Sequence, residues 1–270
     1  MEKIMSPKCI ENVLDSFDFS VEYLTNYRSS NTEDRFSLQD YNKVIKTLLD
    51  NFYPGYDYDI PINHEYQSEA KARTRLSELN GTYKKSGGTV IANSHMLNKW
   101  HDNCKYITFT SLYPATIVKL FEMDKLYFNI KEFGILYKTL FKTKLLLKES
   151  FSEKNYLLLK ILLNFTFGAL NYKESKFITC NNPDLIPSYS ASSFKFLNEN
   201  EKDNIIYIDT DQIYLYEITN LVKHQLDYVL KLPYEVEDIH RMLVLVKKRY
   251  ITIDKDGNIF STGIRLFKRD

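Results

Sequence analysis

The sequence predicts an α+β fold, in which an antiparallel sheet carries helices on one face and an antiparallel helical hairpin is inserted. Three observations support this prediction. Strand-like segments lie between residues 83 and 115, helical spacing follows from about 116 to 172, and strand-like segments return after 205. The polar link SFSEKN at 150–155 is short enough to make the two helices beside it antiparallel neighbours. With 270 residues, 44% hydrophobic and 26% charged, the chain can bury one large core or two modest ones.

The N-terminal region, residues 1–82, is predicted as a helical lead-in and not as a catalytic core. Apolar residues at 38, 41, 44, 45, 48 and 49 have the spacing of one helical face. A second helix is expected over 68–81, where Asn80 and Gly81 end it.

The remaining elements follow in order. Two short strands are expected within 83–95 and 104–115, the first opened by Gly87 and Gly88. Helices are expected over 116–123, 132–149 and 153–172, and the Pro, Ser and Asn content of 181–193 predicts a mobile connection. An amphipathic helix over 219–232 is expected to begin at an N-cap, Thr219.

Several functional classes are disfavoured. Cys9, Cys104 and Cys180 lack the paired spacing of a zinc site or a disulfide framework, which fits a reducing cytosol. The chain has no apolar run of about twenty residues and no signal peptide, so a soluble intracellular protein without a membrane partner is expected.

Charge alone does not identify a nucleic-acid binder, since the net charge is +1. Basic residues are nevertheless clustered, and each cluster is either a solvated face or a binding surface. The clusters are Lys138, Lys142, Lys144 and Lys148; Lys247, Lys248 and Arg249; and Arg265, Lys268 and Arg269.

The segment IIYIDTDQIYLYEI, residues 205–218, places Asp209 and Asp211 within a strand-like run. In an uninterrupted strand the two carboxylates share a face, where their repulsion favours a divalent cation such as Mg²⁺ between them. The alternative is a tight hairpin turn, although the segment offers neither Gly nor Pro.

The motif YIDTD at 207–211 resembles the Y-x-D-T-D-S signature of family B DNA polymerases, which lies at a hairpin turn of the palm sheet. Four other segments resemble motifs of this family in the same order: SGGTV at 86–90, TFTSLYPATI at 108–117, KILLNFTFGALNY at 160–172, and KKRY at 247–250 followed by GIRLFKRD at 263–270. The resemblance implies a palm at 83–125 and 173–270, with fingers at 126–172.

The same resemblance implies roles for individual residues in metal-dependent nucleotidyl transfer with Mg²⁺ or Mn²⁺, primer–template DNA and a dNTP. Asp211 and Asp209 would be the catalytic metal ligands. The implied nucleotide-binding residues are Ser111, Leu112, Tyr113, Lys144, Lys148, Lys160 and Asn164. The implied DNA-binding residues are Gly87, Gly88, Gly168, Lys247, Lys248, Arg249 and Tyr250.

The sequence also departs from the family pattern. Thr108 stands where the first catalytic aspartate is expected, which weakens a two-metal site because a neutral hydroxyl replaces a shared carboxylate. Gln212, Phe165 and Phe167 replace the usual Ser, Ser and Tyr. Paired-acid exonuclease motifs are not evident in the first 80 residues, and the chain stops where a thumb would begin.

Two hypotheses remain open. The first is the palm and fingers of a DNA polymerase, as one piece of a split polymerase in viral or plasmid replication, with separate chains supplying a thumb or exonuclease. The second is a catalytically degenerate polymerase-like domain that binds DNA or a replication protein. A chance match within an unrelated α+β domain is a third, less favoured reading.

Overall fold

The computed structural model describes residues 6–26, 36–55, 88–146, 152–171 and 177–264. The chain forms two compact units, one from residues 1–84 and 117–183 and the other from residues 85–116 and 184–270. The helix predicted over 68–81, as well as Gly87 and Lys148, lies outside the described residues.

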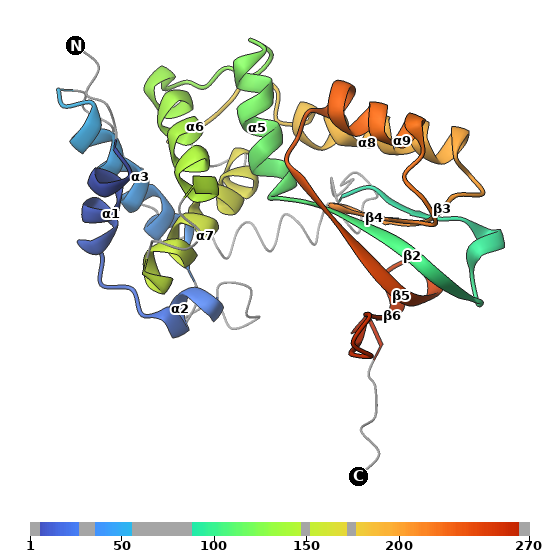
Figure 1. Ribbon diagram of the computed structural model, residues 1–270. Coiled ribbons are helices and arrows are strands. Elements are labelled where there is room, and N and C mark those ends of the chain that lie inside the picture. The colour runs from blue at the N-terminus through green and yellow to red at the C-terminus, as the bar shows by residue number, and fades with distance from the viewer. Residues whose placement is uncertain (1–5, 27–35, 56–87, 147–151, 172–176, 265–270) are drawn as a thin grey trace, which may run out of the picture. The chain divides into compact units, whose positions relative to one another are not determined.

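The first unit is helical. Its helices are α1 (Pro7–Asp15), α2 (Val21–Thr25), α3 (Leu38–Phe52), α6 (Lys131–Leu146) and α7 (Glu153–Leu170). The α6 and α7 helices contact each other, while α1, α2 and α3 all pack against α7 (Figure 1). The helix expected over 38–53 and the helical hairpin are therefore confirmed.

Buried polar contacts tie the N-terminal helices to α7 within this unit. The Tyr41 hydroxyl lies 2.9 Å from the Thr166 hydroxyl, and both residues are fully buried. Burial raises the pKa of Tyr41 well above its usual value. Asn155 donates a hydrogen bond of 2.7 Å to the Asp15 carboxylate. The N-terminal helices therefore share a core with the hairpin.

The second unit contains a seven-stranded sheet in the order β1-β3-β4-β2-β5-β6-β7, with every neighbouring pair antiparallel. The strands are β1 (Val90–Ala92), β2 (Trp100–Phe109), β3 (Ile205–Asp209), β4 (Gln212–Leu215), β5 (Tyr234–Val246), β6 (Arg249–Ile253) and β7 (Ile259–Thr262). Helices α8 (Leu185–Asn200) and α9 (Asn220–His224) lie along one face of the sheet (Figure 1). These features confirm the α+β prediction.

Shorter elements complete the structure. A 3-10 turn, η2 (Ser94–Met96), follows β1, and a π-helical segment, η3 (Gln225–Leu230), extends α9. Helix α5 (Leu112–Glu122) follows β2 and leads from the second unit into the first. The predicted N-cap is confirmed, because the Thr219 side chain accepts a hydrogen bond from the Val222 amide at the start of α9. Among the described residues, no helix has the length and apolarity needed to span a membrane.

The two faces of the sheet bury different side chains because residues alternate along each strand. On the helix-covered face, the rings of Phe109 and Phe194 lie 5.6 Å apart between their centroids. The opposite face, which we call the tyrosine face, carries a cluster of aromatic rings with centroid separations of 4.9 to 6.2 Å. Its aromatic members are Tyr106, Tyr207, Tyr214 and Tyr250.

The mobile connection predicted over 181–193 is wrong, because α8 begins at Leu185. Pro187 lies in the first helical turn, where its missing amide hydrogen is tolerated. The Ser188 and Ser192 hydroxyls donate to the carbonyl oxygens of Asp184 and Ser188. The buried positions of α8 have helical spacing, although its composition resembles that of a loop. These positions are Ile186, Ser190, Ser193, Phe194 and Leu197.

Candidate functional site

The hairpin between β3 and β4 carries the two predicted acids at its turn. Strand β3 ends at Asp209 and β4 begins at Gln212, so Thr210 and Asp211 form the connection. We call residues 209–211 the acid turn. The uninterrupted strand is therefore wrong, and the hairpin turn is confirmed. Thr210 adopts a left-handed φ of 61° without a glycine. Two backbone bonds hold this turn: the Thr210 amide donates to Thr89 at 2.8 Å, and the Asp211 amide donates to Asp209 at 2.7 Å.

The turn is also bonded to the end of β2. The Phe109 amide donates to the Asp211 carbonyl at 2.9 Å. In the sheet register Thr108 lies opposite Gln212, and Gln212 lies opposite Asp209. Side chains at paired positions of neighbouring strands share a face, so Thr108, Gln212 and Asp209 form one row across three strands.

The residues that follow β2 connect its end, which is bonded to Asp211, to α5. Ser111 has a left-handed φ of 55°, and its carbonyl accepts from the Ala115 amide in the first turn of α5. Leu112 is buried. Burial, followed by the negative charge of Asp211, raises the pKa of Tyr113. Tyr113 is therefore close enough to Asp211 for the charge of that acid to act on its hydroxyl.

Tyr106, on β2, adjoins the same acid. Burial is the main cause of its raised pKa, and the charge of Asp211 adds to it, whereas a hydrogen bond with Thr108 opposes it. Thr108 therefore lies in the polar group formed by Tyr106 and Asp211, at the position that the sequence left without an acid.

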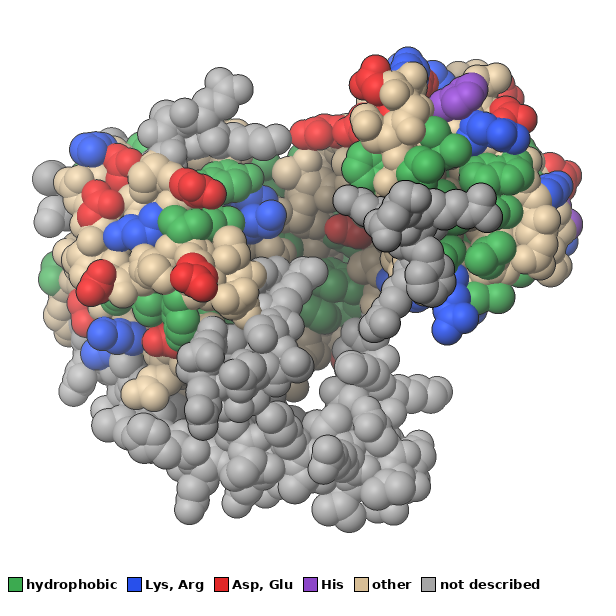
Figure 2. Space-filling model, turned by 90° about the horizontal axis from the view of Figure 1, so that it is seen from below, with side chains coloured by type: hydrophobic (Ala, Val, Ile, Leu, Met, Phe, Trp, Pro, Cys, Tyr) green, Lys and Arg blue, Asp and Glu red, His purple; other side chains and the backbone are tan. Residues whose placement is uncertain are grey.

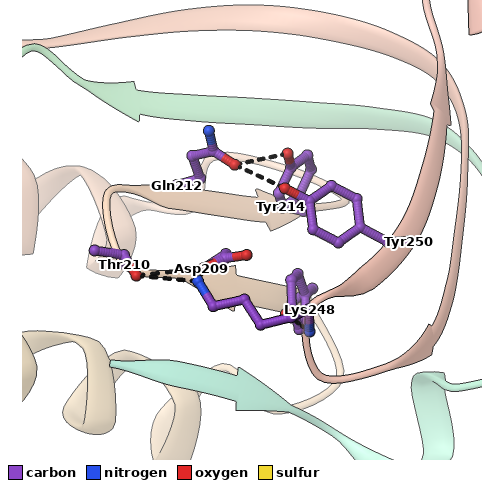
Figure 3. Close-up of polar contacts among 7 residues, drawn as sticks. Asp209, Thr210, Gln212, Tyr214, Lys248 and Tyr250 are labelled. Atoms are coloured by element: carbon purple, nitrogen blue, oxygen red, sulfur yellow. Dashed lines mark hydrogen bonds and ion pairs between the residues drawn. The ribbon is translucent and has the colours of Figure 1, made fainter. Parts of the chain in front are cut away.

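Asp209 has a lysine as its partner. The Lys248 ammonium contacts the Asp209 carboxylate, whose side chain is 7% exposed, and lies 3.4 Å from the Thr210 hydroxyl (Figure 3). Lys248 is in the β5–β6 turn, 39 residues along the chain from Asp209. Its predicted role was DNA binding, and pairing with Asp209 is a contact that the sequence did not indicate.

The other residues of the KKRY segment lie in and after this turn. Lys247 and Arg249 are exposed, whereas Tyr250 is 7% exposed. The Tyr250 ring packs on the tyrosine face, 5.2 Å from the ring of Tyr207 between centroids. Two of the four predicted residues therefore present charge to solvent, and the third cation, Lys248, reaches the acid turn.

Gln212 organises a buried hydroxyl network that the sequence prediction missed. Its amide oxygen accepts hydrogen bonds from the Tyr214 hydroxyl at 3.0 Å and from the Tyr250 hydroxyl at 3.1 Å (Figure 3). Burial raises the pKa of Tyr214 far above its usual value. The sequence contained a signal for this network: Gln212 replaces the usual Ser, and tyrosines occupy alternate positions of the neighbouring strand segments.

A cavity of about 320 Å³ adjoins this network. Residues from β2, β4, β5, β6 and β7 line it, including Tyr106, Gln212, Tyr214, Tyr250 and Phe260. The tyrosine face is thus hollowed beside the acid turn.

Gly88, one of the two predicted turn glycines, packs against the acid turn. A Cβ atom built on Gly88 would lie 2.2 Å from the Thr210 side chain, closer than atoms can approach. The close approach of the Thr210 side chain therefore leaves no room for a side chain at position 88.

The predicted residues of the first unit lie on α6 and α7. Lys144 is 6% exposed, whereas Lys160 and Gly168 are exposed. The Asn164 amide donates to the Lys160 carbonyl at 2.9 Å, and a Cβ atom added to Gly168 would meet no atom within 4 Å. The sequence predicted these as nucleotide and DNA contacts, and that assignment stays a prediction.

Phe165 has a structural explanation in the same unit. Its ring stacks on Tyr41 of α3 at 5.2 Å and meets the edge of Phe36 at 5.7 Å, both measured between centroids. The departure from serine at this position therefore provides a packing surface for the N-terminal helices.

The donor set does not match a site for two shared divalent cations. Within the described part of the chain, no group of three or more His, Cys, Asp and Glu side chains could hold a metal. Asp209 already contacts an ammonium group, and Thr108 contributes no charge. Asp102 lies within β2, six residues before Thr108, and its carboxylate accepts a hydrogen bond of 2.6 Å from the Arg241 guanidinium. Asp102 therefore does not replace the missing acid.

One face of the described residues gives no separate electrostatic signal. On the face drawn in Figure 2, Lys and Arg are interspersed with Asp and Glu, and the described atoms form no broad area of one charge.

Comparison with known proteins finds similarity to DNA polymerases. No family model matches the chain. A DNA polymerase of Pyrococcus glycovorans is 23% identical over 130 residues, which are 42% of this chain and 17% of that protein. This chain spans about a sixth of that relative's length.

Two solved structures share the fold. The family B DNA polymerase of Pyrobaculum calidifontis matches with a TM-score of 0.55 and 16% identity, over 90% of this chain and 35% of that one. The phi29 DNA polymerase, complexed with primer–template DNA and incoming nucleotides, matches with a TM-score of 0.52 and 12% identity, over 94% of this chain and 72% of that one. These matches confirm the resemblance to family B DNA polymerases that the motifs indicated.

Proposed function

We propose that this chain is the palm and fingers part of a DNA polymerase-like protein that binds primer–template DNA and a dNTP and carries out nucleotidyl transfer. One observation carries the proposal: the Asp209–Asp211 turn is bonded to the end of β2, within range of Tyr113 for the Asp211 charge to raise its pKa, and these segments follow the order of the polymerase motifs. The phi29 structure contains both DNA and nucleotide, which supports these two ligands for a related fold.

In this proposal the chain's own groups have distinct tasks. Asp211 is the principal acidic group, and Tyr113 packs beneath the sugar of the incoming nucleotide. The exposed Lys160 on α7 neutralises triphosphate charge, as a lysine point charge does at phosphates. Lys247 and Arg249 contact the phosphates of the primer duplex.

Mg²⁺ or Mn²⁺ is the cofactor in this proposal, where such an ion would stabilise charge on the transferred phosphate. The residues present support one cation at the two aspartates better than a shared pair. We therefore propose that Asp211 is required for catalysis, and we expect slow nucleotidyl transfer.

A second candidate function is DNA binding without catalysis. Thr108 in the acid position and the Lys248–Asp209 contact favour it, since each removes negative charge from the site. Both candidate functions require the same DNA-binding surface. They differ in whether the acid turn catalyses nucleotidyl transfer.

Further domains belong to both candidates. The chain spans about a third of the Pyrobaculum polymerase, so a thumb or an exonuclease would be supplied by a longer protein or by partner chains, as in a split viral or plasmid polymerase.

Fluorescence anisotropy with a labelled primer–template tests the shared part of the proposal. We expect Lys247→Gln/Arg249→Gln to weaken binding about tenfold and to reduce the slope of log K against log salt by about 2, because two phosphate contacts are lost. A matched control, Lys195→Gln/Lys202→Gln, removes two exposed lysines that belong to α8 and the turn after it. Equal affinity and equal slopes for both variants would contradict the assignment.

A further inference from the structure

The carboxylate of Asp209 is almost fully buried, and the cation beside it comes from the protein itself. Asp209 has a side-chain exposure of 7%, while the paired Lys248 side chain is 55% exposed. A buried carboxylate requires a positive partner or hydrogen-bond donors, because removing it from water is costly. Lys248 supplies that partner, with the Thr210 hydroxyl at its side (Figure 3).

The backbone holds Lys248 in place for this contact. Its amide donates to the Tyr207 hydroxyl at 2.7 Å, and its φ is 62°. Gly263 packs so closely that an added Cβ atom would lie 2.1 Å from the Lys248 carbonyl oxygen. The main chain is therefore fixed by β3 and by the segment after β7, while the half-exposed side chain retains freedom to move.

We propose that the Lys248 ammonium is the resident counter-ion of Asp209 and competes with a divalent cation for this carboxylate. The inference rests on the proposed function, and it explains how a polymerase-like turn remains stable without a complete set of metal ligands. Asp209, Asp211 and Lys248 together carry one net negative charge, whereas the two acids alone carry two. A divalent cation consequently binds at full strength when the lysine has moved away.

Manganese binding to the protein without DNA tests this competition. The concentration of free Mn²⁺ is followed by electron paramagnetic resonance for the natural protein, Lys248→Met and the control Lys202→Met. Lys202 is exposed in the same unit, and its substitution removes the same charge. We expect Lys248→Met to lower the dissociation constant for Mn²⁺ at least tenfold, and Lys202→Met to leave it unchanged. Equal constants for the natural protein and Lys248→Met would overturn the proposal.

A second variant retains the lysine, so that the test does not depend on an unpaired buried acid. In Asp209→Asn, Mn²⁺ affinity is expected to fall, because the carboxylate for which the lysine and the cation compete is lost. An equal gain from Lys248→Met in the natural and the Asp209→Asn backgrounds would show that the lysine does not compete for Asp209, and would refute the competition. In Lys248→Met/Asp209→Asn, the gain in affinity is expected to disappear.

These metal measurements are independent of the DNA assay. If primer–template binding fails while Lys248→Met still tightens Mn²⁺ binding, the proposed function falls and the lysine counter-ion stands. If primer–template binding succeeds while Lys248→Met leaves Mn²⁺ binding unchanged, the proposed DNA surface stands and the competition by Lys248 is refuted.

Discussion

Replacing Gln212 by Met tests whether one amide oxygen holds the tyrosine face together. Met has about the length of Gln but no strong hydrogen-bond acceptor, so Gln212→Met removes the acceptor shared by the Tyr214 and Tyr250 hydroxyls. The two tyrosines are 4% and 7% exposed. Both hydroxyls then need a new acceptor in a largely buried position.

The expected cost follows from these contacts. A buried polar group that loses its partner costs about 1–3 kcal/mol. The cavity of about 320 Å³ beside Gln212 has room for water, which favours the lower end of that range for each hydroxyl. We therefore expect Gln212→Met to lower the free energy of unfolding by about 2 kcal/mol in total.

Urea denaturation, followed by circular dichroism, measures this loss. The matched background is Tyr214→Phe/Tyr250→Phe, where both hydroxyls are absent and Gln212→Met should cost less than about 0.5 kcal/mol. A loss of the same size in both backgrounds would refute the hydroxyl network as the reason for Gln212.

Three further predictions concern other parts of the second unit. Gly88→Ala should destabilise the fold by about 1–3 kcal/mol because its methyl group overlaps the Thr210 side chain, whose Cβ would lie 2.6 Å away, and Thr210→Gly, which removes that Cβ, should restore most of that loss in urea denaturation. Burial lowers the pKa of His101, so the unfolded chain takes up the proton first, and stability should fall as pH drops below about 6.5; a flat stability profile between pH 7.5 and 5.5 would contradict this. If DNA phosphates attract the Lys248 ammonium, primer–template DNA should tighten Mn²⁺ binding to the natural protein and have no such effect in Lys248→Met, as calorimetry can show.

Burial is the main cause of that lowered pKa, and the hydrogen bonds of His101 show which form of the ring is buried. Its Nε2 lies 2.7 Å from the Met96 carbonyl and therefore donates, which leaves Nδ1 to accept from the Tyr216 hydroxyl at 2.5 Å. A second proton on the ring would remove this acceptor from a side chain that is 2% exposed. The neutral form is therefore favoured in the folded state.

Local spacing was sufficient to predict several elements of this fold. Apolar periodicity located α3 and the α6–α7 hairpin, and Thr219 marked the start of α9. The motif resemblance, rather than strand alternation, corrected the position of Asp209 and Asp211. Strand alternation alone did not predict the turn, because Thr210 adopts a left-handed conformation that is uncommon for threonine.

Contacts between distant residues were beyond such reasoning. The contact of Lys248 with Asp209 depends on two hairpins meeting across the sheet, and the stacking of Phe165 on Tyr41 depends on α3 packing against α7. Helix α8 was missed for a different reason, since its serines and proline resemble a loop in composition while its buried positions follow a helical period.

Primer extension on a labelled primer–template with Mg²⁺ or Mn²⁺ tests the central claim most directly. The claim is that the acid turn and the end of β2 form a polymerase-like site that has one carboxylate fewer, because Thr108 stands in the position of an aspartate. We expect slow extension by the natural protein, at least tenfold faster extension by Thr108→Asp, and no extension when Asp211→Ala is added to either. Extension that is unchanged by Thr108→Asp and survives Asp211→Ala would contradict the account.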